Sequence, residues 1–292
     1  MTELPRVVAT DLDGTLLRSD GTVSPRTRSV LAAVEAAGIE VVFVTARPPR
    51  WLGQLEDLVG GHGRVICLGG AAVWDLGSGQ ALDVCGFTPD AVRGLVTDLR
   101  DTEPDVALAF ERTDGPVFDP WFPKDEAGIP AQARAVPVEL SIGTHEHGAP
   151  RELVAKLLAL DPRATGSPHG RLADADHTSH DDFFDRVRGV TRDRAHLAYS
   201  GAVGLAELLP PGVTKDAALA RWCDRLGVAP HEVWAFGDMP NDLPMLTWAG
   251  RAIAVANAHP DVLARADAVA GRNDVDGVAG YLERLLADLS SA

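Results

Sequence analysis

The sequence contains few cysteines, the residues that form disulfides and many zinc sites. Its three cysteines, Cys67, Cys85 and Cys223, are odd in number and widely spaced, and they form no CxxC pair. We therefore predict neither a disulfide framework nor a zinc site, and we interpret these residues as buried free thiols in a reducing compartment. No run approaches the roughly 20 apolar residues of a membrane-spanning helix. The start of the chain, MTELPRVV, lacks the basic flank and apolar stretch of a signal peptide, so a cytoplasmic protein without membrane association is expected.

Positive charge is also scarce. Lys and Arg total 27 against 42 Asp and Glu, a formal net charge of -15. This balance disfavours nonspecific binding to nucleic acid or to an anionic membrane surface, and an anionic substrate would need local positive charge. Three common catalytic signatures, GxxxxGK[ST], HExxH and GxSxG, are missing as well. Nucleotide-loop, zincin and serine-hydrolase interpretations are therefore without support.

The patterns that are present alternate between strand and helix at both ends of the chain. Apolar runs at 6–10, 39–47 and 64–70 read as strands, and Ser24-Pro25 opens a helix that Gly38 closes. Beyond residue 207 the alternation returns, with a helix ending at Gly227, two strands and a terminal amphipathic helix. Such continuous apolar strands are usually covered by helices on both faces. The predicted fold class is α/β, with a doubly wound parallel sheet as its core.

The middle of the chain has a different character. At 292 residues the chain exceeds the usual domain size of about 100 to 200 residues. Between about residues 83 and 205 it is richer in Pro, Asp and His, and stretches such as DGPVFDPWFPKDEAGIP and GSPHGRLADADHTSHDD show no sustained period. We therefore predict a catalytic core made of residues 1–83 and 207–292, with residues 84–206 forming an inserted domain. The cluster DADHTSHDD, residues 174–182, is interpreted as polar loop rather than as a metal site.

Pairs of carboxylates end two of the predicted strands. Asp11 and Asp13 follow the first strand at i and i+2, so both side chains should face one spot at the carboxyl edge of the sheet. Asp238 and Asp242 repeat the device after a later strand, and open α/β sheets bind ligands at that edge. Converging carboxylates raise one another's pKa unless a cation lies among them, and oxygen-only ligation suits Mg²⁺.

Two further residues stand at ends of predicted elements. Thr45 ends the second strand, where a β-former with a satisfied hydroxyl is the ordinary interpretation. Lys215 falls in the first turn of a helix, where the helix dipole prefers an anion. That position favours a role for Lys215 other than helix stabilisation.

Together the ordered motifs DLDGTLL, VTAR, PGVTKDAAL and GDMPNDLPML, followed by AGRAIAVANAHPDVLARADAV and NDVDGVA, resemble the haloacid dehalogenase superfamily of phosphotransferases, and within it the Cof-like hydrolases with a type IIB cap. The resemblance covers the core nearly end to end. It implies an α+β cap for the insertion and hydrolysis of small phosphomonoesters, such as sugar phosphates, by a Mg²⁺-dependent phosphatase.

The resemblance also implies a role for each motif residue. Asp11 would be the nucleophile that forms an aspartyl phosphate, and Asp13 the general acid and base. Asp11, Asp13 and Asp238 would hold Mg²⁺, with Asp242 supporting them. Such a nucleophile splits one difficult hydrolysis into two easier displacements.

The phosphoryl group would be held by Thr45 and Lys215, with Asn241 near the substrate phosphate. The chain departs from the family pattern at Gly69, where Asn is common, and at Met239, where Gly is usual.

Substrate selection is expected from the cap, with Trp121, Lys124 and Arg171 as candidates for reading the ester. Two alternative functions remain at this point. One is a phosphomutase-like phosphotransferase, and the other a non-catalytic regulator that binds phosphorylated metabolites. The presence of both Asp11 and Asp13 argues against the regulator, because binding alone does not need both.

Overall fold

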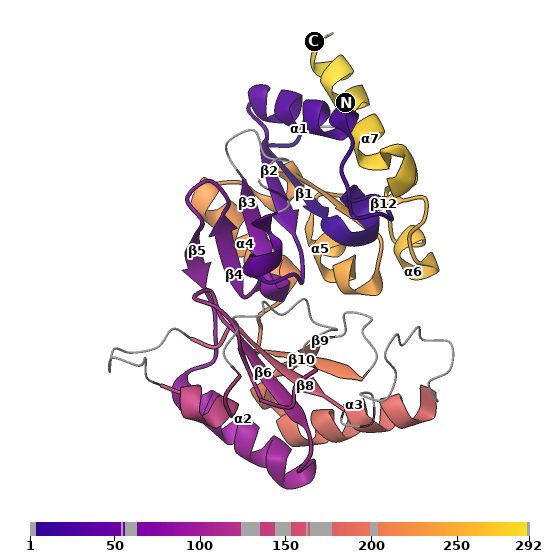
Figure 1. Ribbon diagram of the computed structural model, residues 1–292. Helices are drawn as coiled ribbons and strands as arrows, with labels where there is room; N and C mark the ends of the chain where they lie inside the picture. The colour runs from indigo at the N-terminus through magenta and orange to yellow at the C-terminus, as the bar shows by residue number, and fades with distance from the viewer. Residues whose placement is uncertain are drawn as a thin grey trace. The chain divides into compact units, whose positions relative to one another are not determined.

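The computed structural model describes residues 4–53, 55, 63–123, 135–143, 153–161, 163, 177–198 and 204–290. The chain divides into two compact units, Met1–Asp83 with Thr214–Ala292, and Val84–Val213. Both ends of the chain belong to the first unit (Figure 1). The sequence-based division at residue 206 falls inside strand β10, Leu205–Leu209, which pairs with two strands of the second unit. Strand β10 thus belongs to the second unit, which continues to Val213.

The first unit is built on an eight-stranded sheet in the order β13-β12-β11-β1-β2-β3-β4-β5. The ladders from β13 through β3 are parallel, and β4 runs antiparallel to β3. Every residue of β1 and β11 is buried, as expected for strands covered on both faces. The strand bounds are β1 Val7–Asp11, β2 Glu40–Val44, β3 Arg64–Cys67, β4 Ala72–Asp75, β5 Gln80–Val84, β11 Val233–Gly237, β12 Arg251–Val255 and β13 Ala268–Ala270.

The helices of this unit pack in two pairs, α1 (Pro25–Ala36) with α7 (Gly277–Ser290) and α4 (Lys215–Leu226) with α5 (Leu243–Trp248). The short α6 (Pro260–Leu263) contacts β12. Figure 1 shows the pairs on either side of the strands. The predicted helix signals are confirmed: the Ser24 hydroxyl accepts from the Thr27 amide at 3.0 Å, and Gly227 closes α4 with φ +63°. The predicted α/β core with a mostly parallel sheet is therefore confirmed.

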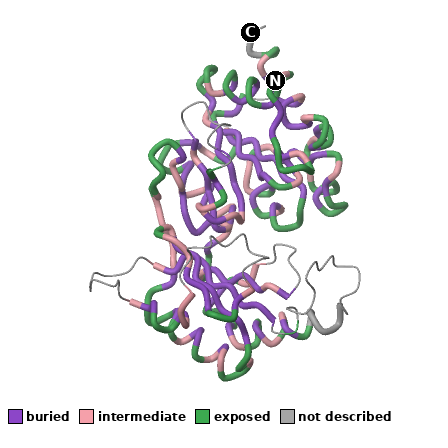
Figure 2. The backbone as a smooth tube through the Cα atoms, in the orientation of Figure 1, coloured by how far each residue is buried: buried purple, intermediate pink, exposed green. Residues whose placement is uncertain are grey.

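The second unit has an antiparallel five-stranded sheet in the order β7-β6-β8-β10-β9. Its strands are β6 Ala107–Glu111, β7 Val117–Phe118, β8 Lys156–Leu160, β9 His196–Ala198 and the already described β10. Helices α2 (Pro89–Thr102) and α3 (His177–Thr191) pack together, and both contribute to a core with β6, β8 and β10. Figure 2 shows these strands buried beside partly exposed helices.

Sequence analysis assigned no helix to residues 84–206, and the structure shows two, α2 and α3. Helix α2 buries Val92, Leu95, Val96 and Leu99, the i, i+3, i+4, i+7 spacing of an amphipathic helix. The loop interpretation of residues 174–182 is also wrong from His177 onward, where α3 begins; residues 174–176 lie outside the described residues.

The structure also bears on cysteine and membrane predictions. Cys67, Cys85 and Cys223 are free; Cys67 and Cys223 are buried, as predicted, whereas Cys85 is half-buried. Among the helices that the structure describes, none combines the length and apolar character needed to cross a lipid bilayer.

Candidate active site

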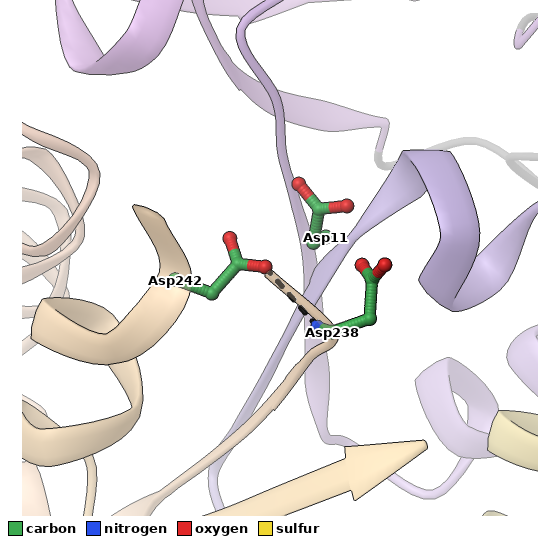
Figure 3. Close-up of side chains that lie close together, drawn as sticks. All are labelled: Asp11, Asp238 and Asp242. Carbon is green, nitrogen blue, oxygen red and sulfur yellow. Dashed lines mark hydrogen bonds between the residues drawn. The ribbon is translucent and has the colours of Figure 1, made fainter. Parts of the chain in front are cut away.

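Three carboxylates meet at the carboxyl ends of β1 and β11. The two strands are parallel neighbours with Thr10 opposite Phe236, so Asp11 and Asp238 emerge side by side. Asp242 reaches the same place from the turn Pro240–Asp242 that follows β11. Each of the three is buried, and one oxygen from each lies within 4.8 Å of the others (Figure 3). The structure thus brings together three of the four aspartates that sequence analysis assigned to the site.

A buried lysine holds two of these carboxylates. Lys215, in the first turn of α4, donates from Nζ to Asp11 Oδ1 at 2.5 Å and to Asp242 Oδ1 at 2.7 Å. The other oxygen of Asp242 accepts from the backbone amides of Asp238 at 3.2 Å and Met239 at 3.1 Å; Figure 3 shows the Asp238 bond. The helix dipole disfavours a cation in the first turn of α4, but the buried carboxylates of Asp11 and Asp242 stabilise the Lys215 ammonium group there.

Burial sets the protonation behaviour of this cluster. Desolvation and the charge of Asp242 raise the pKa of Asp11 well above its ordinary value, against the attraction of Lys215. Desolvation likewise raises the pKa of Asp238 to about 6, although the Thr15 hydroxyl lowers it. Desolvation lowers the pKa of Lys215, but the carboxylates of Asp11 and Asp242 outweigh it, so that this pKa lies above its usual value. The cluster is an anionic pocket containing one cation.

The loop after β1 fits closely against Asp238. Gly14 adopts φ +82°, and a Cβ built there would lie 2.4 Å from Asp238 Oδ2, so that only glycine is accommodated. The next residue, Thr15, is buried and donates its hydroxyl to Asp238 Oδ1 at 2.6 Å. Sequence analysis assigned no role to Thr15; its position directly after DLDG was the available signal.

Asp13 differs from the three buried carboxylates in being exposed. Its side chain is 58% exposed and forms a two-pronged ion pair with Arg47, with Nε at 2.8 Å from Oδ2 and Nη2 on Oδ1. The potential metal group found among the described residues consists of Asp11, Asp238 and Asp242, so the role of Asp13 as a metal ligand stays a prediction. Sequence analysis included Arg47 in the motif VTAR but assigned it no role. It follows Thr45 by two residues just beyond β2, the strand beside β1, as Asp13 follows Asp11, and that shared spacing was a usable signal.

The remaining core residues lie at neighbouring turns. Thr45 is buried, and its hydroxyl accepts from the Arg47 amide at 3.1 Å. Asn241 is exposed in the turn Pro240–Asp242. Met239, where the family pattern has glycine, has φ −113°, an ordinary extended value that accommodates a side chain without strain. Gly69 has φ +70°, a value that favours glycine.

Of the proposed cap residues only Trp121 lies among the described residues. Its side chain stacks on the Arg100 guanidinium at 5.1 Å from the ring centroid, and its indole N–H donates to the Val106 carbonyl at 3.4 Å. Trp121 is 51% exposed. Lys124 and Arg171 lie outside the described residues, so all three assignments stay predictions.

The donor set fits a hard divalent cation. Asp11, Asp238 and Asp242 offer only oxygen, and neither His nor Cys joins the group among the described residues. Their mutual repulsion and burial raise two of the three pKa values, which a bound cation would relieve. Mg²⁺ prefers such carboxylate oxygens, whereas zinc sites usually include nitrogen or sulfur.

The fold and the site together define a class, the α/β enzymes with acidic groups gathered at the carboxyl edge of a largely parallel sheet. The chain belongs to the haloacid dehalogenase-like hydrolase family, whose sequence model matches residues 8–282. It is therefore a phosphatase of this superfamily, a phosphoric monoester hydrolase, and the family resemblance read from the motifs is confirmed.

Relatives and solved structures match almost the whole chain. The HMP-PP phosphatase of Yersinia enterocolitica is 28% identical over 284 residues, covering 97% of this chain and 96% of that protein. The pyridoxal phosphate phosphatase YbhA of Escherichia coli is 26% identical, covering 95% and 97%. A Thermotoga maritima crystal structure matches with a TM-score of 0.76 at 22% identity, covering 96% and 97%. A haloacid dehalogenase-like hydrolase from Bacteroides thetaiotaomicron matches at 0.72 and 24%, covering 97% and 100%. The two structures establish the shared fold.

Proposed function

We propose that this protein is a Mg²⁺-dependent phosphatase of the cytoplasm that hydrolyses small phosphomonoesters, sugar phosphates or similar metabolites, through an aspartyl-phosphate intermediate. The observation that carries the proposal is the buried Asp11 carboxylate at the end of β1, held through Oδ1 by Lys215 at 2.5 Å. The names of the relatives, an HMP-PP phosphatase and a pyridoxal phosphate phosphatase, support small phosphorylated substrates.

Asp11 is the proposed nucleophile. Its contact with Lys215 orients the carboxylate and leaves Oδ2 to attack phosphorus. The Oδ2–P bond forms while the ester P–O bond breaks, and Asp13 donates its proton to the leaving alkoxide. In the second step Asp13 removes a proton from water, the resulting hydroxide attacks phosphorus, and the acyl-phosphate bond breaks to release phosphate and restore Asp11. Dividing the reaction in this way requires a residue that can both give and take one proton.

Arg47 is placed to orient Asp13 as a carboxylate, the form that accepts a proton from water in the second step. It contacts both oxygens of Asp13 through a fork that matches a carboxylate, and the resulting pair restricts how that exposed side chain can turn. Lys215, Thr45 and Asn241 are assigned to the phosphoryl group. The ammonium group of Lys215 supplies the positive charge that a phosphate needs in this acidic protein.

The charge of the site explains why a metal is included. Asp11, Asp238 and Asp242 carry three negative charges when ionised, and Lys215 offsets only one. Asp11, Asp13 and Asp238 would hold Mg²⁺, with Asp242 supporting them through its contacts with Lys215 and with the Asp238 amide. A bound Mg²⁺ supplies charge neutralisation and polarisation of the phosphoryl oxygens. Substrate discrimination is assigned to the inserted unit, because the core residues named here serve the phosphoryl group and the metal.

Release of inorganic phosphate from a panel of sugar phosphates, nucleotides and vitamin-related phosphate esters tests the proposal. Asp11→Asn should fold as the wild type yet retain less than about a hundredth of its turnover, because an amide does not form the acyl phosphate. Circular dichroism and a melting curve control for folding. Turnover above that level would remove Asp11 from the role of nucleophile.

The same panel, repeated with an acceptor sugar, separates hydrolysis from the phosphomutase-like alternative. A hydrolase releases phosphate at the same rate with and without the acceptor. Transfer of most phosphoryl groups to the acceptor would instead favour the transferase. Binding of phosphorylated metabolites without phosphate release from any ester would favour the regulator.

A further inference from the structure

Two asparagines from the C-terminal part of the chain donate hydrogen bonds to the loop that carries Asp13. Asn257, just after β12, donates from Nδ2 to the Gly14 carbonyl at 2.7 Å. Its Oδ1 accepts from the backbone amide of Asn273 at 2.9 Å, and Asn273 in turn donates from Nδ2 to the Leu17 carbonyl at 3.0 Å. Asn273 is buried and Asn257 half-buried. The amides thus form one relay, and both lie in sequence stretches, ANA and NDVDGVA, to which no task has been assigned.

The relay bridges parts of the chain that are remote in sequence. Asn257 is 243 residues from Gly14, and Asn273 is 256 residues from Leu17. The indigo N-terminal segment and the orange to yellow C-terminal segments both lie in the first unit, and the turn Leu12–Leu16 contacts α7 and the turn Asn273–Val275 (Figure 1). Asn257 and Asn273 therefore contact the loop that carries Asp13 from a region where the two ends of the chain pack together.

The Gly14 carbonyl, one of the two acceptors, lies where the turn departs from helical geometry. Asp13 and Gly14 both depart from helical geometry, and Gly14 has φ +82° and ψ −10°. Glycine occupies such conformations freely but is not restricted to them, so an external contact is needed to hold one orientation. The Gly14 carbonyl belongs to the peptide that joins Gly14 to Thr15. Holding this peptide restrains the backbone that carries Asp13 on one side and the Thr15 hydroxyl on the other.

A second tether on the same segment serves as a comparison. Asp274, next to Asn273, accepts from the Ser19 amide at 2.8 Å and from the Ser19 hydroxyl at 2.9 Å. These bonds are exposed and hold the chain after the loop has ended. They join the same two parts of the chain without touching the peptide between Gly14 and Thr15.

We propose that Asn257 and Asn273 are positioning residues for catalysis, because their relay fixes the Gly14–Thr15 peptide and thereby holds the Asp13 carboxylate in the direction required for proton transfer. This inference rests on the proposed function, since it takes Asp13 as the general acid. Neither asparagine touches the reacting atoms in this scheme. Their effect is on how often Asp13 is correctly aligned with the leaving group.

The test measures kcat/KM for phenyl phosphate and for p-nitrophenyl phosphate with Mg²⁺, because this parameter reports the step in which the ester bond breaks. The weakly acidic phenol needs a proton on leaving, whereas p-nitrophenol needs it much less. In Asn257→Ala and Asn273→Ala we expect a fall of about 10- to 100-fold with phenyl phosphate, the usual cost of a small misplacement, and a clearly smaller fall with p-nitrophenyl phosphate. The double variant should lose no more than the worse single variant, because the two amides form one relay.

Three further variants make the result decisive. Asp274→Ala, which removes only the Ser19 tether, should keep the wild-type ratio of the two rates. Asn257→Asp keeps the shape and the acceptor for Asn273 but cannot donate to the Gly14 carbonyl once ionised, so it should reproduce the Asn257→Ala ratio even if the alanine variant folds poorly. Asp13→Asn provides the reference for complete loss of the acid.

The outcomes separate the inference from the function on which it rests. If the asparagine variants melt at lower temperature but keep the wild-type ratio, their role is structural and the inference is wrong. If Asp13→Asn itself shows no greater loss with phenyl phosphate than with p-nitrophenyl phosphate, the assignment of Asp13 as general acid fails instead.

Discussion

Replacing Lys215 with methionine should separate the stability of the site from its activity. In the wild type the Lys215 ammonium lies 2.5 Å from Asp11 and 2.7 Å from Asp242, and its side chain is 7% exposed. Methionine has a similar length and packs in an apolar environment but leaves both carboxylates without this cation. Because Lys215 is also assigned to the phosphoryl group, Lys215→Met should lose turnover under all metal conditions.

The expected loss of stability follows from the buried contacts. Removing one partner of a buried ion pair typically destabilises a protein by about 3–5 kcal/mol, because the remaining charge is left uncompensated. At about 2–4 °C per kcal/mol, this corresponds to a decrease of roughly 6–20 °C in the melting temperature without metal. The decrease should be smaller at acidic pH, since burial already raises the pKa of Asp11 and protonation removes the repulsion.

The assay is thermal unfolding in EDTA and in Mg²⁺, with phosphate release measured on the same samples. Mg²⁺ at 100 times its Kd adds about 2.7 kcal/mol to any protein that binds it only when folded. We expect a larger Mg²⁺-induced rise in melting temperature for Lys215→Met than for the wild type, since the metal no longer competes with the ammonium for Asp11. Mg²⁺ should not restore phosphate release by Lys215→Met even though it raises the melting temperature of this variant.

The control is Lys156→Met, which breaks the buried 2.8 Å pair with Glu207 in the second unit. That variant should be destabilised to an extent that Mg²⁺ does not change. A Lys215→Met protein as stable as the wild type in EDTA, or one whose melting temperature ignores Mg²⁺, would refute the reasoning.

Three other outcomes are expected. EDTA should abolish phosphate release and Mg²⁺ restore it, while Ca²⁺ should inhibit because its larger and looser coordination disturbs the alignment of the displacement; full activity after metal removal would contradict a metal site. In metal-free protein, burial raises the pKa of Asp238 to about 6, above that of an unfolded aspartate, so the folded state binds this proton more tightly; the stabilisation is present at low pH and is lost as pH rises through about 6. The melting temperature should therefore fall from about pH 4 to about pH 6, and less steeply in Asp238→Asn; an equal slope in both proteins would count against this origin. Finally, Trp121→Ala, and likewise substitutions of Lys124 or Arg171, should change the relative rates among esters with the Mg²⁺ requirement unaltered, and an unchanged ranking for all three would exclude these side chains from substrate selection.

The sequence by itself was enough to predict the core and the acidic cluster. Buried parallel strands have continuous apolar patterns, and helix caps such as Ser24 and Gly227 act within one turn, so both leave local signals. The meeting of Asp11, Asp238 and Asp242 was also predictable, because the carboxyl ends of parallel strands lie at one edge. No helix was assigned at α2, although the spacing of its buried residues, Val92, Leu95, Val96 and Leu99, is a local signal in the sequence.

Only the tertiary structure decided which side chains hold the catalytic loop. Arg47 pairs with Asp13 across two neighbouring strand ends, and Asn257 reaches Gly14 over 243 residues of intervening chain. A local pattern specifies the element on which a polar residue lies and the side that it faces. The partner of that residue depends on strand order and register, which arise when the whole sheet assembles. For this reason the carboxylates of the site were visible in the sequence, whereas the contacts that orient Asp13 were not.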